Sequence, residues 1–425
     1  MRISTTTMRW TGAALAIVFA GALTGLAQQT QPAPTAKPQP PGGGKPQDPG
    51  GFSRAPAAAF PTQPQEIQLV GTRIRVVPAV AELANPWSIA FLPNGDMLVT
   101  EKPGRLRIVR TGKLDPAPIA GVPKVFAVAQ GGLLEVLPHP NFAQNQFLYL
   151  TYSKPGEQEG TATTALARGR FDGKALTDVK DLLVAENWNK GGIHFGSKLA
   201  FGRDGFLYMT LGERTDRDRS QSLGSHGGKI LRLRDDGTPA PGNPFEGKPD
   251  AKPEIYSYGH RNAQGLAFHP ETGELWSNEH GPQGGDELNI IKPGKNYGWP
   301  VVTHGREYGP NGALVSKQTW REDIEDPVLI WSPSIGISGL MFYTGDKFPF
   351  WKNQIFVGGL SGLRVDRVAF NEKGGLLGRD TIMLNHRVRD VRQGPDGNIY
   401  VAVDSNPGGV LRLEPAGTQT SSAGQ

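Results

Sequence analysis

The sequence predicts an all-β protein in which one sheet-forming unit occurs six times. The chain has 57 Gly and 36 Pro among 425 residues and is only 37% hydrophobic, which is typical of many short strands joined by turns. An apolar segment, a polar turn and a second apolar segment recur, with equivalent positions at Phe91, Leu137, Phe201, Phe268, Phe342 and Gly394. These positions lie 46 to 74 residues apart, a length for one four-stranded sheet with its loops. We therefore expect a six-bladed β-propeller.

Tight turns inside the repeated units support the strand assignment. Asn94-Gly95, Asp204-Gly205 and Asp396-Gly397 each separate two apolar runs, and such pairs close short hairpins because they tolerate positive φ. A two-sheet sandwich is the competing arrangement, but it would not need the same unit six times. In a propeller the loops at one end of the central channel converge, so residues far apart in sequence can face one ligand.

The two ends of the chain are expected to lie outside the propeller. Residues 1–27 are predicted to be a signal peptide, because Arg2 and Arg9 precede an apolar run and small residues follow it at the spacing of a cleavage site. Residues 28–66 are rich in Pro, Gly, Gln and Ala and are predicted to be a disordered linker. The propeller is then expected at residues 67–415, followed by a disordered tail at 416–425.

Composition limits the location and the partners. The N-terminal apolar run is too short to span a membrane, and no other segment reaches the roughly 18 apolar residues required, so we expect no stable membrane insertion. The chain has no Cys, which excludes disulfides and thiolate metal sites. Its net charge of +5 is not gathered in a basic run with interleaved aromatics, so we expect no nucleic-acid partner. A periplasmic or secreted bacterial enzyme is the natural interpretation.

A candidate acid–base pair stands at the third repeat. His194 lies immediately before the repeat strand and Glu213 lies at the far end of its hairpin, so the hairpin can bring the carboxylate to the imidazole. That carboxylate would hold one tautomer and increase the basicity of the ring, as a general base requires. A lone His is more often structural, and this alternative stays open from the residues alone.

Other polar residues stand in loops at the second and fourth repeats. Gln130 could hydrogen-bond a planar ligand or brace its own loop. Arg261, followed by Asn262, could pair with a carboxylate of the protein or stabilise negative charge on a ligand oxygen.

Two further groups favour ions. The carbonyls of a Gly281-Pro282 turn, with Asp286, Glu287 and Tyr297 close behind, suit calcium, although the spacing is not that of a helix–loop–helix calcium site. Arg387 and Arg389 alternate and therefore point to one face of a strand end. Two guanidinium groups on one face favour an anionic ligand, and the alternative is pairing with Asp390 or Asp404.

Taken together, these segments resemble the soluble PQQ-dependent sugar dehydrogenases, the glucose and aldose sugar dehydrogenase family. The resemblance runs in order from about Leu83 to Leu413 and is carried by GGIHFGSKLAF, GHRNAQGLAFHP, NEHGPQGGDELN, GKNYGWP and RVRDV followed by PDGNIY. It implies a six-bladed propeller that oxidises aldose sugars at the anomeric carbon to lactones, with hydride transfer to PQQ and with Ca2+. A small-molecule sugar substrate and an unidentified electron acceptor are the implied partners.

The resemblance also implies roles for individual residues. His194 resembles the catalytic base, Glu213 the acidic residue that orients it, and Arg261 the residue that stabilises the oxyanion. The positions that match cofactor contacts are Gln130, Arg261, Asn262, Ser334, Arg387 and Arg389, the last two as a clamp for the PQQ carboxylates. The positions that match calcium ligands are Gly281 and Pro282 at the active site, and Glu287 and Tyr297 at what can be a second, structural site.

One segment departs from the family pattern. Family members usually present a Lys to the quinone where this chain has Ser361 and then Arg364. Either Arg364 binds the cofactor from a shifted loop or the contact is lost, and an Arg does not simply replace a Lys where a point charge is needed.

Two other functions remain open from the sequence. A calcium-dependent propeller hydrolase of the lactonase type would use His194 to activate water, but it would have no use for the two-arginine clamp. A non-catalytic carbohydrate-binding propeller is the second alternative, since this architecture hosts many functions.

Overall fold

The computed structural model describes residues 57–371 and 374–417. The chain separates into two units, Met1–Gln47 and Asp48–Gln425, and the first lies outside the described residues. The predicted signal peptide, residues 28–56 of the predicted linker and residues 418–425 of the predicted tail also lie outside them, so these assignments stay predictions. Within the described ranges, no helix combines the length and the apolar character needed to cross a bilayer.

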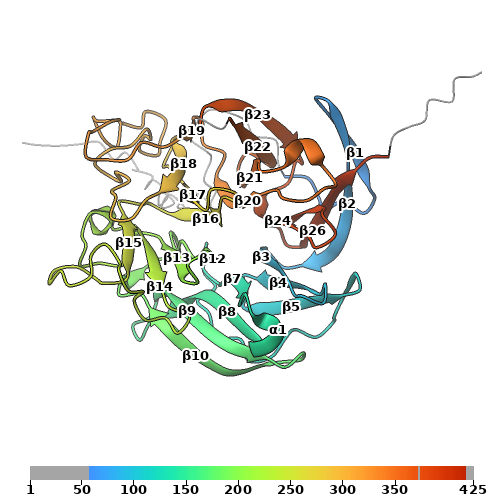
Figure 1. The fold of residues 1–425 in the computed structure, drawn as a ribbon, viewed down its shortest axis with the longest axis horizontal. Coiled ribbons are helices and arrows are strands. Elements are labelled where there is room, and N and C mark those ends of the chain that lie inside the picture. Colours follow the sequence, from blue (N-terminus) through green and yellow to red (C-terminus); the bar gives the residue numbers. More distant parts are fainter. Residues whose placement is uncertain (1–56, 372–373, 418–425) are drawn as a thin grey trace, which may run out of the picture. The chain divides into compact units, whose positions relative to one another are not determined.

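The described residues form six antiparallel sheets arranged in a ring (Figure 1). The innermost strands are β3, β7, β12, β16, β20 and β24. Each innermost strand contacts the innermost strand of the next sheet, and β24 contacts β3. The sheets therefore close on themselves, and the predicted six-bladed β-propeller is confirmed.

The first three sheets run as follows from the innermost strand outward. The first contains β3 (Pro86–Phe91), β4 (Met97–Glu101), β5 (Arg105–Arg110) and β6 (Lys113–Leu114). The second contains β7 (Leu133–Pro138), β8 (Phe147–Pro155), β9 (Thr161–Phe171) and β10 (Leu176–Val184), with β11 (Asn189–Lys190) paired to β9 and the short helix α1 (Phe142–Asn145) between β7 and β8. The third contains β12 (Leu199–Phe201), β13 (Leu207–Leu211), β14 (Lys229–Leu233) and β15 (Ile255–Tyr258), with the 3-10 helix η1 (Arg217–Ser220) between β13 and β14.

The remaining sheets follow the same plan. The fourth contains β16 (Ala263–Phe268), β17 (Leu275–Glu279), β18 (Asp286–Ile291) and β19 (Leu329–Trp331). The fifth contains β20 (Ile337–Phe342), β21 (Ile355–Gly359), β22 (Arg364–Phe370) and β23 (Leu376–Met383), with the 3-10 helix η2 (Pro349–Trp351) between β20 and β21. The sixth contains β24 (Val388–Gln393), β25 (Ile399–Val403), β26 (Gly408–Pro415), β2 (Thr72–Leu83) and β1 (Gln65–Leu69).

The sixth sheet joins segments from both ends of the described chain. β2 pairs antiparallel with β26, for example Val76 with Leu413, so hydrogen bonds hold the ring closed. Residues 57–66, which the sequence places in the linker, take part in this sheet region. Phe60 packs against its apolar core, the amide of Ala58 donates to the carbonyl of Asn385 at 2.8 Å, and β1 already begins at Gln65.

Apolar side chains fill the space between neighbouring sheets. Separate buried clusters lie between the first and second sheets, the second and third, the third and fourth, the fourth and fifth, the fifth and sixth and the sixth and first. The second strands β4, β13 and β21 are buried along their whole length, because neighbouring sheets cover both of their faces. This explains why those segments read as continuous apolar runs rather than as alternating patterns.

One end of the sheets collects the residues singled out from the sequence. In an antiparallel hairpin the start of the innermost strand lies beside the end of the second strand, as Ala263 pairs with Glu279. Residues that precede an innermost strand and residues that follow a second strand therefore lie together. We call this end of the ring the site end.

A buried ionic network links innermost strands just inside the site end. The ammonium of Lys198 lies 2.7 Å from Glu135 and 2.8 Å from Asp390, and the guanidinium of Arg392 lies 2.5 Å from Glu135 and 3.0 Å from Asp390. Burial alone would raise the pKa of Asp390, but the charges of Arg392 and Lys198 outweigh it and lower the pKa. Two cations thus balance two anions. Asp390 pairs with Lys198 and Arg392, so the suggested pairing of Asp390 with Arg387 or Arg389 is wrong.

Candidate functional site

The predicted pair of His194 and Glu213 forms. His194 Nδ1 lies 2.6 Å from Glu213 Oε2, and Glu213 follows β13 as the hairpin argument expects. The backbone of His194 is left-handed, with φ of 57°, and its carbonyl lies so close to Gly212 that a Cβ there would come within 2.1 Å of it. Such a backbone persists only where the surrounding structure fixes it, and strain of this kind gathers at functional sites.

The environment of His194 favours the neutral imidazole. Burial lowers the pKa of His194 and the charge of Arg261 lowers it further, against the opposing effect of Glu213. Burial alone would raise the pKa of Glu213, but its bond to His194 and the charges of His194 and Arg261 outweigh this and lower it. A neutral ring that donates from Nδ1 to this carboxylate carries its lone pair on Nε2. The pair can therefore accept a proton at Nε2.

Gln130 contacts the same loop. Its side-chain oxygen accepts a hydrogen bond of 2.8 Å from the amide of His194. Gln130 therefore stabilises a loop, as one of its two suggested roles requires. The same hydrogen bond places its carboxamide beside the candidate base.

Arg261 is held in a fixed position by the fourth sheet. Its amide donates to Glu279 at 2.6 Å, and its guanidinium donates to the carbonyl of Gly281 at 3.1 Å and lies 5.2 Å from the ring centroid of Trp299. Among the described residues, the guanidinium pairs with carbonyls and forms no direct ion pair with a carboxylate. It can stabilise negative charge on a ligand.

Asn262 and Gln264 connect the fourth sheet to the third and sixth. The side-chain oxygen of Asn262 accepts from the amide of Gly196 at 3.0 Å and from Gln264 at 3.2 Å. Gln264 in turn accepts from Arg389 at 3.1 Å. This short chain of hydrogen bonds brings Arg389 to the same part of the site end as Asn262.

Three cations gather around Asp404. Arg389 lies 3.1 Å from its carboxylate, and Arg387 and Lys102 each lie 3.9 Å from it. Burial alone would raise the pKa of Asp404, but Arg389, Lys102 and Arg387 lower it to about 2. The pairing with Asp404 that the sequence left open is therefore present. One carboxylate cannot balance three cations, so the cluster keeps an excess of positive charge that favours an anionic ligand.

These groups surround one region. Lys102 donates to the carbonyl of Ala129 at 3.2 Å, and Ala129 directly precedes Gln130. These contacts therefore connect the Asp404 cluster to the loop of His194 around the site end. Burial lowers the pKa of His280 well below its usual range, and the charges of Arg261, Arg389, His194 and Arg387 lower it further. The amide of Glu213 donates to the carbonyl of Arg261 at 3.0 Å, and the hydrogen bonds from Asn262 through Gln264 lead on to Arg389, so these groups border one region.

The predicted calcium residues lie beside Arg261. Gly281, Glu287 and Tyr297 line one small cavity together with Glu279, whereas Pro282 packs against Gly305. Burial raises the pKa of Glu287 well above its usual range and the charge of Glu279 raises it further, so a cation would relieve the repulsion between these carboxylates.

Other observations limit how a metal could be held there. The hydroxyl of Tyr297 already donates to the carbonyl of Ile290 at 2.7 Å. Within the described residues, no group of three or more His, Cys, Asp or Glu side chains is arranged to hold a metal ion. A calcium ion would depend on backbone carbonyls and on the buried carboxylate pair, and calcium binding stays a prediction.

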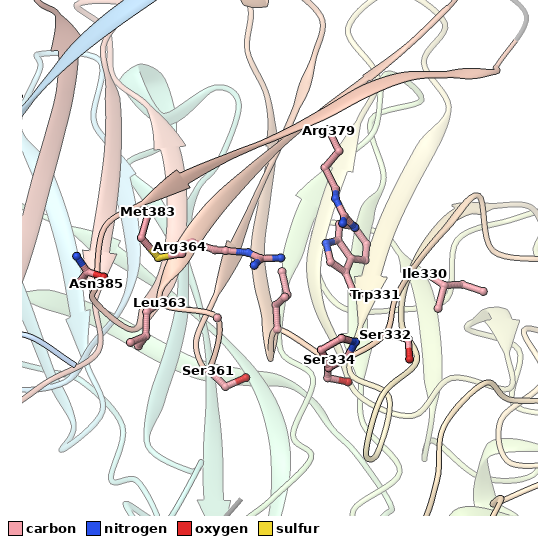
Figure 2. A pocket seen from close by; sticks show the side chains of 13 residues that line it. Ile330, Trp331, Ser332, Ser334, Ser361, Leu363, Arg364, Arg379, Met383 and Asn385 are labelled. Atoms are coloured by element: carbon pink, nitrogen blue, oxygen red, sulfur yellow. The ribbon is translucent and has the colours of Figure 1, made fainter. Parts of the chain in front are cut away.

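Ser334, Ser361 and Arg364 line a different pocket of about 590 Å³. Figure 2 shows Arg364 reaching into this pocket between Met383 on one side and Trp331 and Arg379 on the other. The guanidinium of Arg364 is paired with Asp366 at 2.9 Å, and Ser334 hydrogen-bonds Asp286. His194, Arg261 and Arg389 are not in the lining of this pocket. Asp286 also accepts from the amide of Gly281 at 3.0 Å and so joins Ser334 to the turn beside Arg261, and contact of Ser334 and Arg364 with the cofactor stays a prediction.

Sequence reasoning misses several members of the site. It assigns no role to Lys102, Gln264, Glu279 and His280. A usable signal is present, because an acidic residue ends or follows the second strand in four repeats, at Glu101, Glu213, Glu279 and Asp404. Of these acidic positions, sequence reasoning connects only Glu213 to a partner with a stated catalytic function.

Known proteins with similar sequences and structures fit this arrangement. The family model described as Glucose / Sorbosone dehydrogenase matches residues 83–412. Aldose sugar dehydrogenase YliI of Escherichia coli (strain K12) is 42% identical over 338 residues, which cover 79% of this chain and 91% of that protein.

Two solved structures are similar over nearly their whole length. The soluble aldose sugar dehydrogenase from Escherichia coli in the apo-form superposes with a TM-score of 0.77 at 40% identity, covering 81% of this chain and 100% of that one. The PQQ-bound form of aldose sugar dehydrogenase from Streptomyces coelicolor gives a TM-score of 0.66 at 28% identity, covering 84% and 99%. The family match spans most of the sequence and includes every residue of the site end described above, so the chain belongs to the glucose/sorbosone dehydrogenase family.

Proposed function

We propose that this protein is a PQQ- and calcium-dependent dehydrogenase that oxidises aldose sugars at the anomeric carbon to lactones. One observation carries the proposal. A carboxylate-oriented imidazole, an arginine whose guanidinium forms no ion pair within the described residues, and a cluster with an excess of positive charge border the same region of the site end. The names of the similar dehydrogenases agree with it.

The donor set fits PQQ, a planar quinone that carries carboxylates. Arg387, Arg389 and Lys102 would hold carboxylates through the positive charge that Asp404 leaves unbalanced. Gln130 and Asn262 would border its plane. When bound, PQQ would accept the hydride from the anomeric carbon and calcium would act as the Lewis acid.

The chain's own residues supply the proton chemistry and the electrostatics. His194 would take the proton of the anomeric hydroxyl on Nε2, while its Nδ1–H stays on Glu213. The imidazolium that results would be stabilised by the Glu213 carboxylate, which is ionised because its pKa is lowered. Arg261 would stabilise negative charge that develops on an oxygen beside it, and its bonds to Gly281 and Glu279 fix it for this role.

Calcium, location and the electron acceptor complete the proposal. Gly281 and Pro282 would offer carbonyl oxygens to calcium, and the cavity that holds Glu287 and Tyr297 would take a second ion. A periplasmic or secreted location follows from the predicted signal peptide. An external acceptor must then reoxidise the reduced cofactor.

Reconstitution tests the proposal. The purified chain is treated with chelator, supplied with PQQ in the presence or absence of calcium, and assayed for aldose-dependent dye reduction, with the product identified by NMR. We expect dye reduction that requires both additions and a lactone product. Hydrolysis of added lactones without dye reduction would favour the calcium-dependent hydrolase instead. Sugar binding without any turnover would favour the non-catalytic propeller.

A further inference from the structure

A hairpin-like loop lies beside Arg261 at the site end. It comprises residues 305–315, which we call the tongue, and it belongs to the segment between β18 and β19. Arg306 forms antiparallel bridges to both Gln283 and Leu314, and the amide of Glu307 donates to the carbonyl of Ala313 at 2.8 Å. The tongue is thus tied to the turn that follows Gly281-Pro282 and has a defined conformation.

A second attachment fixes the tongue to the third sheet. The guanidinium of Arg217 in η1 pairs with both carboxylate oxygens of Glu307, at 2.5 and 2.8 Å. Arg217 also lies 5.3 Å from the ring centroid of Trp299, the same ring that Arg261 approaches from 5.2 Å. A two-bond pairing of this kind fixes direction as well as distance. The tongue is therefore anchored next to Arg261 from two sides.

The tongue carries an exposed aromatic residue at this point. The hydroxyl of Tyr308 lies 3.5 Å from Nη2 of Arg261, which is long for a hydrogen bond but places the side chain at the candidate site. Tyr308 is nevertheless 61% exposed, so most of its ring is not covered by protein. An uncovered aromatic ring on an anchored loop beside a binding region offers contact area to a ligand, and a Tyr side chain has few rotatable bonds to order.

We propose that Tyr308 positions the sugar, with its ring packed against the apolar C–H face of an aldose whose anomeric hydroxyl faces His194. The inference rests on the proposed function and deepens it. A sugar ring carries hydroxyl groups at its edge and C–H groups on its faces. His194 and Arg261 would contact only the hydroxyl groups. Tyr308 is the exposed aromatic residue that contacts Arg261, so it is placed to supply the missing apolar contact. Glu307 and Arg217 support it without touching the sugar.

Three variants and a control test the role. Tyr308→Ala removes the ring, Tyr308→Phe keeps the ring and removes the hydroxyl, and Glu307→Gln loosens the tongue while Tyr308 stays. Phe350→Ala is the matched control, because Phe350 is an exposed aromatic in η2 in the loop after β20, at the other end of the sheets. The chain is loaded with PQQ and calcium. Steady-state dye reduction gives KM and kcat for glucose, and calorimetry on the protein whose bound cofactor has first been reduced chemically gives the dissociation constant for glucose.

The expected results separate stacking from a merely structural role. Tyr308→Ala should raise both KM and the calorimetric dissociation constant about tenfold, the scale of one aromatic contact, with kcat within about threefold. Tyr308→Phe should restore both constants to within about twofold of wild type, Glu307→Gln should lie between, and Phe350→Ala should match wild type. The affinity for PQQ should be the same in all variants within about twofold.

The outcomes distinguish this inference from the proposed function. An active wild type with unchanged KM and dissociation constant in Tyr308→Ala would overturn the role of Tyr308 and leave the dehydrogenase intact. A wild type that binds glucose without turnover, and loses that binding in Tyr308→Ala, would overturn the dehydrogenase and support the positioning role. A wild type that binds no aldose would overturn both.

Discussion

Replacing Glu213 by Gln tests the candidate base most sharply, because it changes only the buried carboxylate that contacts His194. Glu213 Oε2 lies 2.6 Å from His194 Nδ1 and also accepts from the amide of Thr215 at 3.0 Å. A Gln side chain of the same shape keeps its carbonyl oxygen at this position, where it accepts from both Nδ1–H and the amide of Thr215, but it loses the negative charge. The imidazolium that forms when Nε2 takes the proton would then lack a carboxylate beside it.

The size of the effect follows from that loss. General-base catalysis contributes about 10²- to 10⁴-fold, and a hydrogen bond to a charged group is worth about 1.5 to 3 kcal/mol. We therefore expect kcat of Glu213→Gln to fall by about 10- to 100-fold, equivalent to about 1.4 to 2.7 kcal/mol of lost transition-state stabilisation. His194→Gln should cost at least as much. The double variant should be no worse than His194→Gln, because the two residues act as a unit.

The pH dependence of the rate is an independent test of His194 as the base. His194 is active as a base when neutral, so the rate should fall as pH decreases through its pKa, which burial lowers from its usual 6.5. Glu213 opposes that lowering, so the acid limb should move to still lower pH in Glu213→Gln. Stopped-flow absorbance can record the single-turnover reduction of the bound cofactor by glucose over a range of pH. This experiment gives both the rate and the pH at which the rate falls on the acid side. A Glu213→Gln rate within about threefold of wild type, with the acid limb unmoved, would refute the assignment of His194.

Three further predictions concern stability and cofactor binding. Lys198→Met should lower the free energy of unfolding by about 3 to 5 kcal/mol, because it leaves Glu135 and Asp390 with one buried cation between them. Urea titration measures this free energy. A loss below about 1 kcal/mol would contradict the importance of the ionic network. The raised pKa of Glu287 means that the metal-free wild type should lose stability as pH rises above 4.5 and through that raised pKa. Glu287→Gln should abolish this loss in chelator, as urea midpoints at about pH 5 and about pH 8 would reveal, and a parallel decline in both proteins would count against it. Arg389→Gln should weaken PQQ binding by about 10- to 100-fold, the scale of one or two charge-assisted hydrogen bonds, and an unchanged absorbance titration would place the cofactor elsewhere.

The repeat pattern located the sheets because it depends on local structure. Phe91, Phe268 and Phe342 are the last residues of innermost strands β3, β16 and β20, where a hairpin turn and an apolar strand are visible in a short window. The pairing of β2 with β26 was not predictable in this way. It joins residues near opposite ends of the described chain, and β1, which pairs with β2, begins at Gln65, before the boundary expected at residue 67.

The same distinction explains which parts of the site could be predicted. His194 and Glu213 are separated by one hairpin, so their contact follows from local geometry. Arg389 meets Gln264 across 125 positions of sequence, and this contact exists only because the ring closes. The resemblance left open whether Arg364 binds the cofactor, and no sequence pattern pointed to Asp366, which pairs with its guanidinium within the fifth sheet.

The central claim is that loops from different sheets meet around a single quinone at the site end. An experimental structure of the chain with PQQ and calcium tests it most directly. The account predicts the quinone between His194 and Arg261, with its carboxylates on Arg387 and Arg389. A quinone bound in the pocket between Arg364 and Arg379 without contact to His194 or Arg261 would contradict it.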